Sequence, residues 1–309
     1  MSDVEDFQKY LAAKKSVDDV SLNERVFRTM VGLLPPMSAV QPVRVLEIGA
    51  GIGTMLERLL ERDCLPYAHY TAVERDPSHL DVFRQRLDAW TQRHGYSINA
   101  GTKETFIIAG RNRESTVNLC ACNITEYLST VDAGKKTDLV IANALLDLVD
   151  IDELLPLLFK HTSTDGILYF TINFDGLTII EPTIDASLDE RILSIYHASM
   201  DDRSTARKEN GHSKTGRRLL SIIPFYGGTI RAAGSSDWVV YPQNKHYTPD
   251  QTYFLHYFIQ GVQSALKNNP GINIDTLNEW TQKRHAQIDE GELILIVHQI
   301  DVVGEKNRK

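Results

Sequence analysis

The pattern of apolar and polar positions alternates between two periods from about residue 43 onward. Short runs rich in β-branched residues predict strands at 43–48, 70–73, 117–122, 139–142 and 167–172. Between these runs apolar residues recur at helical spacing, as they do over 80–90 and 154–159. Strands that alternate with helices of this length pair in parallel through right-handed crossovers. The pattern therefore predicts an α/β fold built on a mostly parallel sheet.

The alternation breaks after residue 175. Residues 177–214 predict one helix, in which Ser187 is the N-cap and Glu190 is the N3 residue of a capping box. A helix near 217–225 and a strand near 229–233 resume the alternation. Two further helices are predicted within 242–289, the first with Thr248 as its N-cap and Pro249 at N1, and a β-branched strand follows at 292–303.

These changes suggest a division of the chain. We assign 1–40 to an N-terminal helical segment and 41–176 to the core of alternating strands and helices. We assign 177–214 to an inserted lid, and 215–309 to the completion of the sheet, with a second helical insertion at 242–289. Both insertions would emerge where the strands end, which is the edge at which ligands bind in open α/β sheets.

Composition narrows the class of protein. With 309 residues, of which 42% are hydrophobic and 24% charged, the chain can bury a core without disulfide or metal staples. Its net charge of −8 disfavours nucleic acid and anionic membranes as partners. The acidic N-terminus and the lack of a long apolar run predict a cytoplasmic protein. Cys64, Cys120 and Cys122 are predicted to be small buried hydrophobes in a reducing compartment.

The first strand runs directly into a glycine-rich turn, Glu-Ile-Gly-Ala-Gly-Ile-Gly-Thr from Glu47 to Thr54. Its third glycine, Gly53, comes one position too early for the dinucleotide pattern G-x-G-x-x-G. A phosphate-binding P-loop is excluded, because no Gly-Lys-Ser/Thr follows. An acidic residue two positions before the first glycine favours a ligand with a positive charge near the turn over a pyrophosphate.

This turn resembles motif I of the class I S-adenosylmethionine (SAM)-dependent methyltransferases. The second strand ends at Glu74, 21 residues after Gly53, where the family binds the ribose hydroxyls. A carboxylate suits that role, since it can accept two hydroxyl hydrogen bonds. Asn123 departs from the aspartate that the family usually has at the third strand end, beside the adenine. The segment 138–143 matches the fourth-strand motif, so that the resemblance covers about 41–175, and 215–309 fits the last two strands.

The resemblance implies a Rossmann-like sheet of seven mostly parallel strands, with the last strand antiparallel and the helical insertions forming a lid. It also implies SAM as the cofactor. The residues expected at the cofactor are Glu47, Gly49, Gly51, Gly53, Thr54, Glu74, Arg75, Asn123, Ile124 and Asn143. A lid over this edge would exclude water from the reaction.

The acceptor site is less clearly marked. Asp147 and His197 are candidate bases, with a loop or N-cap carboxylate and a core histidine as the plain alternatives. Arginines near the lid favour an anionic acceptor, since guanidinium pairs with carboxylate or phosphate, although most such charges are simply solvated. The residues predicted to contact the acceptor are Asn173, Asp175, Arg203, His212, Arg217 and Trp238. No metal is predicted, because the match to magnesium-dependent relatives at the fourth and fifth strand ends is loose.

The sequence thus predicts methyl transfer from SAM to an oxygen or nitrogen of a small metabolite, with an anionic one favoured. The partner is a small molecule, and a homodimer is compatible with the chain. Two alternatives stay open: a methyltransferase-like binding subunit without activity, and a nicotinamide-dependent oxidoreductase. The early third glycine and Glu47 argue against the second.

Overall fold

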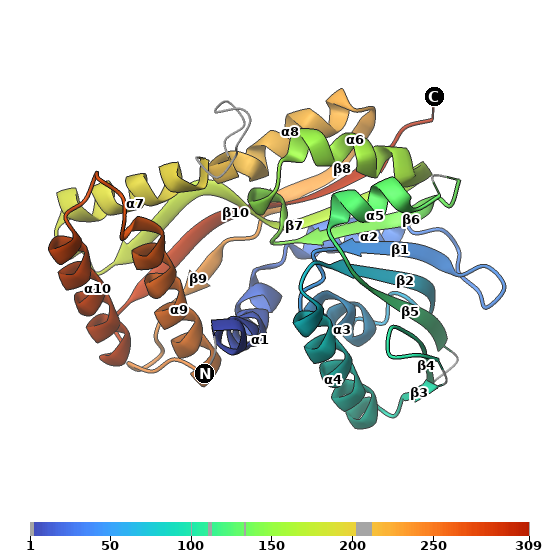
Figure 1. Cartoon of the computed structure of the whole chain (residues 1–309), viewed down its shortest axis with the longest axis horizontal. Helices are drawn as coiled ribbons and strands as arrows, with labels where there is room; N and C mark the ends of the chain where they lie inside the picture. Colours follow the sequence, from blue (N-terminus) through green and yellow to red (C-terminus); the bar gives the residue numbers. More distant parts are fainter. Residues whose placement is uncertain (1–2, 100, 111–112, 133, 202–211, 309) are drawn as a thin grey trace.

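The computed structural model describes residues 3–99, 101–110, 113–132, 134–201 and 212–308, and one long sheet runs through them (Figure 1). The strand order is β3-β4-β5-β2-β1-β6-β7-β10-β8, and β9 pairs with β10. The strands are β1 (Val43–Ile48), β2 (Tyr67–Glu74), β3 (Ser97–Asn99), β4 (Thr105–Gly110), β5 (Arg113–Ala121), β6 (Thr137–Asn143), β7 (Thr162–Glu181), β8 (Gly228–Ser235), β9 (Trp238–Val240) and β10 (Ile294–Lys306). The helices are α1 (Asp3–Ser21), α2 (Glu24–Leu33), α3 (Thr54–Glu61), α4 (Pro77–His94), α5 (Ile124–Thr130), α6 (Ile151–His161), α7 (Ala186–Asp201), α8 (Thr215–Phe225), α9 (Pro249–Leu266) and α10 (Ile274–Asp289), with short 3-10 turns η1 (Leu146–Leu148) and η2 (His212–Lys214).

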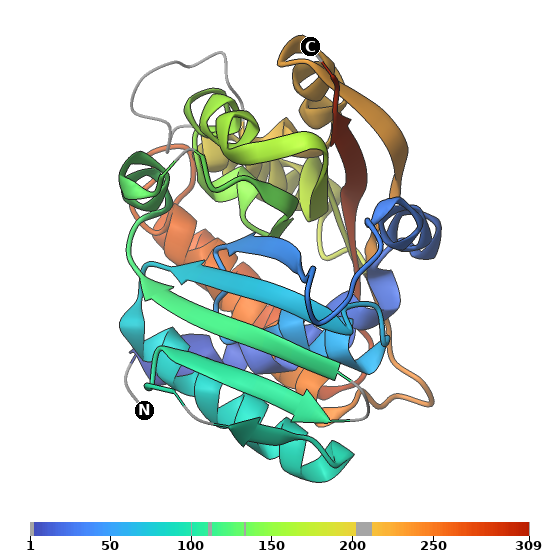
Figure 2. The ribbon, with the colours of Figure 1, turned by 90° about the vertical axis from the view of Figure 1, so that its right-hand side faces the viewer.

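The predicted fold class is confirmed. Strands β5, β2, β1, β6 and β7 pair in parallel, and β10 lies antiparallel between β7 and β8. The sheet has more strands than the seven we expected, because β3 and β4 form an antiparallel hairpin beside β5 and because β9 pairs with β10. Figure 2 shows the hairpin continuing the sheet past β5.

Two helical layers enclose the sheet because side chains alternate along each strand. On β1, Val43 and Val45 pack with α2, α3 and α4, whereas Leu46 and Ile48 pack with α5, α6 and α8 on the other face. A third apolar cluster lies at one end of the molecule. There α1, α7, α9 and α10 pack against the far part of β7, the start of β10, and β9 (Figure 1).

The predicted break after residue 175 is wrong, because β7 continues to Glu181. Its last residues pair with the start of β10, with Thr178 opposite Val297 and Ile180 opposite Leu295. All four side chains are buried there. Tertiary pairing that a local pattern cannot reveal therefore extends the strand beyond the edge of the parallel core.

The two predicted helix starts have different outcomes. The Thr248 capping box is confirmed, since Thr248 accepts from the Gln251 amide and the Gln251 side chain accepts in return. Ser187 is not the N-cap of α7, which begins one residue earlier. The carboxylate of Asp185 accepts the Leu188 amide at 2.8 Å, and an aspartate caps a helix as well as a serine does.

Within the described ranges, every helix is too short or too polar to span a bilayer.

The lid helices are held together by a buried ion pair. Arg284 of α10 is fully buried, and its guanidinium lies 2.6 Å from the carboxylate of Asp189 on α7. The indole of Trp280 donates to the same oxygen at 2.6 Å. Removing one member of such a pair leaves the other charge buried without its compensation.

We therefore expect Arg284→Ala to lower the free energy of unfolding by about 3–5 kcal/mol, as measured by urea denaturation. Arg28→Ala is the matched control. Arg28 pairs with Glu24 on the surface with both side chains more than half exposed, and its removal should cost about 0.5 kcal/mol or less. Equal effects of the two substitutions would contradict this account of the lid.

Candidate functional site

The turn between β1 and α3 is built from glycines in the left-handed region. Gly49, Gly51 and Gly53 have φ of 64°, 53° and 83°. A Cβ at Gly53 would lie 2.7 Å from the ring of Phe83, so this glycine serves packing. A Cβ at Gly51 would have only Leu11 of α1 within 4 Å, at 3.6 Å. Gly51 is thus the position at which a ligand can approach the backbone.

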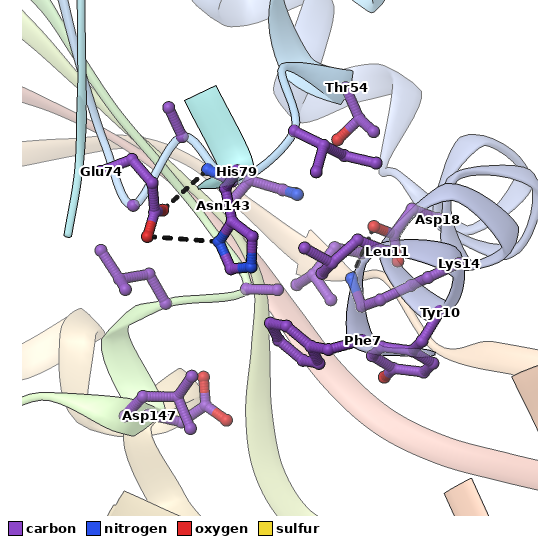
Figure 3. A pocket seen from close by; sticks show the side chains of 18 of the residues that line it. Phe7, Tyr10, Leu11, Lys14, Asp18, Thr54, Glu74, His79, Asn143 and Asp147 are labelled. Atoms are coloured by element: carbon purple, nitrogen blue, oxygen red, sulfur yellow. Dashed lines mark hydrogen bonds and ion pairs between the residues drawn. The ribbon is translucent and has the colours of Figure 1, made fainter. Parts of the chain in front are cut away.

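Glu74, at the end of β2, holds this turn in place. Its Oε2 accepts the Gly51 amide at 2.9 Å, and its Oε1 accepts the Asp76 amide at 3.0 Å. His79 Nδ1 lies 3.4 Å from Oε1 (Figure 3). Burial raises the pKa of Glu74, but the hydrogen bonds from His79 and the two amides outweigh it and lower the pKa. The carboxylate is therefore ionised, and it keeps acceptor capacity for a ligand's hydroxyls.

Glu47 lies beneath the turn in a different environment. It is 2% exposed, and its carboxyl group accepts a 2.7 Å hydrogen bond from the Tyr70 hydroxyl. Burial raises the pKa of Glu47 to about 8, against the lowering effects of Tyr70 and Arg58. Glu47 is thus largely protonated at neutral pH, and it does not present the full negative charge that the sequence suggested.

A cavity of about 910 Å³ opens at the carboxyl ends of β1, β2, β5 and β6. Nine of the ten predicted cofactor residues line it, and Gly53 does not. They are Glu47, Gly49, Gly51, Thr54, Glu74, Arg75, Asn123, Ile124 and Asn143. The side chain of Asn123 caps α5 by accepting the Thr125 amide, and that of Asn143 accepts from the Thr171 hydroxyl.

The other wall of the cavity comes from the lid and from α1, which the sequence did not place there. Lining residues from α1 include Phe7, Tyr10, Leu11, Lys14 and Asp18, those from α7 are Tyr196 and Met200, and those from α9 are Tyr257, Phe258 and Gly261. The sequence signal for α1 was faint, because two aromatic residues on one helix face, here Phe7 and Tyr10, are also typical of a helix that packs in the core. Lys14 stands four residues before Asp18, but this spacing is equally typical of a solvated helix face, and the burial of the pair is seen only in the structure.

Trp238 lines the cavity, as predicted, and belongs to a polar network. Its indole nitrogen donates to Asp18 at 2.9 Å, and Lys14 Nζ lies 2.6 Å from the same carboxylate and 5.1 Å from the indole ring centroid. Arg58 reaches Asp18 at 3.4 Å. The charge of Lys14 is therefore compensated within the wall.

Asp147 lines the cavity from η1, the turn that follows β6. In Figure 3 it projects toward the space between η1 and the α1 residues Phe7 and Tyr10. Burial is the main cause that raises the pKa of Tyr10, and the charges of Asp18 and Asp147 add to it. Asp147 and Tyr10 are therefore within electrostatic reach of one another across the part of the cavity that α1 and η1 line.

Several predicted acceptor residues lie outside the cavity wall. Asn173 is buried and donates to the Ile300 carbonyl at 2.8 Å. Arg217 pairs with Asp175 at 2.9 Å, with its side chain more than half exposed. His197 contacts the Thr178 hydroxyl at 3.0 Å and packs against Phe174, and burial lowers its pKa.

Two more predicted residues fall outside what the structure describes. Arg203 lies in the range 202–211, and of His212 only the backbone is described. The arginine contact that favoured an anionic acceptor therefore has no support among the described residues. The described residues also contain no group of three or more His, Cys, Asp or Glu suited to a metal ion.

Comparison with known proteins shows that this chain resembles several solved structures in fold. No protein-family model matches the chain, and no curated protein does. A solved structure from Anaeromyxobacter dehalogenans, assigned as a type II methyltransferase, is 16% identical, with 93% of this chain and 97% of that chain covered and a TM-score of 0.49.

Two further structures resemble the chain less closely. A cyclopropane synthase from Mycobacterium tuberculosis is 10% identical over 91% of this chain and 83% of its own, with a TM-score of 0.43. A protein from Galdieria sulphuraria, assigned as a sarcosine dimethylglycine methyltransferase, is 12% identical over 92% and 82%, with a TM-score of 0.42. At TM-scores below 0.5 we base no functional conclusion on these likenesses.

The buried Glu47 generates a pH-dependent prediction. Its pKa in the folded protein, about 8, is above the value of about 4.3 for an unperturbed glutamate, so the folded state binds more protons between these values. The contribution of Glu47 to the free energy of unfolding is fully present at low pH and is lost as the pH rises toward 8. Relative to Glu47→Gln, the wild type should therefore lose free energy of unfolding between about pH 5 and pH 8, by at most about 1.4 kcal/mol per pH unit. Denaturant titrations of both proteins across this range would measure the difference, and parallel curves would show that Glu47 is ionised in the folded state.

Proposed function

We propose that this protein is a SAM-dependent methyltransferase that acts on an oxygen or nitrogen of a small molecule. The observation that carries the proposal is the continuity of the cavity. The open backbone at Gly51 and the ionised Glu74 lie at one end, and an enclosed wall of α1, α7 and α9 lies at the other. One ligand site leading into a compartment lined by aromatic side chains suits a cofactor and an acceptor that must meet.

The residues at the first end fit SAM. Glu74 would accept hydrogen bonds from the ribose hydroxyls, and the turn at Gly49–Gly51 would let the ligand approach its backbone. Asn123 and Ile124 would lie beside the base. Bound SAM supplies a methyl group that is already activated on a sulfonium, with its leaving group built in.

The protein's own contribution is then positioning, exclusion of water and removal of a proton. The lid and α1 enclose the acceptor, which makes the transfer effectively intramolecular. Asp147 is the candidate base, because its carboxylate lines the acceptor side of the cavity. His197 lacks that position and serves the packing between β7 and α7.

The alternatives are separated by binding and by activity. Calorimetry should detect binding of SAM and of its product S-adenosylhomocysteine, and none of NAD or NADP. Incubation of the isolated protein with methyl-labelled SAM and a metabolite extract should yield a labelled product by mass spectrometry. Binding of SAM without any labelled product would favour the inactive binding subunit, and binding of NAD alone would favour an oxidoreductase.

Glu74→Ala should weaken SAM binding at least tenfold in calorimetry. The ribose hydroxyls would lose a charged acceptor worth about 1.5–3 kcal/mol per bond, and the Gly51 amide would lose its partner. Glu126→Ala is the control, since Glu126 is an exposed carboxylate of α5 outside the cavity wall. Unchanged affinity in a folded Glu74→Ala protein would overturn the cofactor assignment.

Asp147→Asn should lower kcat by about 10²–10⁴ while SAM affinity stays near normal, because it removes the proton acceptor and keeps the side chain's shape. His197→Ala should keep kcat within a few-fold of the wild type. Steady-state kinetics with the identified acceptor measure both. If Asp147→Asn retains the wild-type kcat, the proton leaves by another route.

A further inference from the structure

The acceptor end of the cavity is walled by aromatic rings from separate parts of the chain. Tyr10 of α1 and Tyr257 of α9 stack with centroids 4.3 Å apart, and Phe254 backs Tyr10 at 5.8 Å. Tyr196 of α7 and Trp238 of β9 complete the wall. Aromatic residues from distant parts of the chain thus line one cavity, and Figure 3 shows Tyr10 with its α1 neighbour Phe7.

The charges around this wall are arranged for a cation. Among the described lining residues, Lys14 is held by Asp18, and Arg75 lies next to Glu74 at the opposite end. Neither is placed to pair with an anion at the aromatic wall. Asp18 is itself paired with Lys14 and Arg58, whereas Asp147 lines the cavity and its charge reaches Tyr10, which is the sense of field that attracts a positive charge. Tyr10 and Tyr257 each cover one face of the other, and the ring faces that stay uncovered add to that attraction through their quadrupole.

We propose that the acceptor is an organic amine, which binds as its ammonium ion against Tyr10, Tyr257 and Tyr196 and is methylated on nitrogen. This deepens the proposed function and rests on it. An amine also explains why carboxylates and aromatic rings line a cavity beside a methyl sulfonium. The sulfonium and the ammonium carry the same sign of charge, so the same lining suits both.

The transfer balances as follows. The ammonium gives one N–H proton to the Asp147 carboxylate and becomes the neutral amine. Its lone pair forms the bond to the methyl carbon as the carbon–sulfur bond breaks, and that electron pair stays on sulfur. Positive charge therefore passes from sulfur to nitrogen, and the methylated ammonium remains in an environment that suits it.

The test uses two probes of the same shape and different charge. Choline carries a quaternary nitrogen, and 3,3-dimethylbutan-1-ol has carbon in its place. Each is titrated by calorimetry into full-length protein saturated with S-adenosylhomocysteine, so that the cofactor site is already filled. We expect choline to bind at least tenfold more tightly than its neutral isostere.

Substitutions of Tyr257 on α9 test whether the aromatic wall causes the preference for choline. Tyr257→Leu should reduce the choline preference at least fivefold, and Tyr257→Phe should retain it, because the ring face and not the hydroxyl carries the attraction. Tyr241→Leu is the matched control. Tyr241 is half exposed, lies outside the cavity wall and should leave the preference unchanged.

The two proposals fail in distinguishable ways. If the wild type does not bind S-adenosylhomocysteine, the methyltransferase proposal is overturned. If it binds S-adenosylhomocysteine but shows equal binding of the two probes, or binds neither, the amine acceptor is overturned and the methyltransferase proposal stands. A preference for choline that survives Tyr257→Leu would place the cation elsewhere and also overturn the inference.

Discussion

The antiparallel pairing of β7 with β10 is the constraint on which the rest of the structure depends. It runs from Ile167 opposite Glu305 to Glu181 opposite Ile294, and so joins the parallel core to the region beyond its carboxyl edge. The register shifts at Asp301, which is fully buried in the irregularity. Its carboxylate accepts the Ile172 amide of β7 at 2.7 Å, within the irregularity, and the Asn23 amide at the start of α2 at 2.8 Å.

That extension turns an open sheet edge into an enclosed site. The continued strands give α7, α9 and α10 an apolar surface to cover, and residues of α7 and α9 then line the same cavity as the glycine turn. The start of the chain closes the remaining side. Asp18 of α1 bonds to Trp238 and Lys14, and Asn23, just after α1, is anchored by Asp301. The cavity is therefore closed only when the first and last parts of the chain have met.

Local patterns predicted what local physics determines. The strands of the core, the glycine turn, the Thr248 capping box and the carboxylate at the end of β2 each follow from neighbouring residues. The partners of charged side chains could not be predicted, because they are non-local. Arg217 meets Asp175 across 42 positions, and Trp238 meets Asp18 across 220. Nothing near Tyr10 in the sequence indicates that Tyr257 will stack on it. The glycine turn and its carboxylate could thus be predicted from the sequence, whereas the opposite wall of the cavity depends on tertiary assembly.

The placement of charge ties the two ends of the cavity together. Methyl transfer from a sulfonium begins with a positive charge on sulfur and, for a nitrogen acceptor, ends with one on nitrogen. A cavity wall that stabilised an anion would destabilise the positive charge both before and after the transfer. In the described wall, Lys14 is instead paired with Asp18, and burial keeps Glu47 protonated. Aromatic rings and Asp147 also line the cavity. For the transfer that we propose, a field of this sense would stabilise the cation both before and after the methyl group moves, which is the preorganisation that catalysis in a low-dielectric site requires.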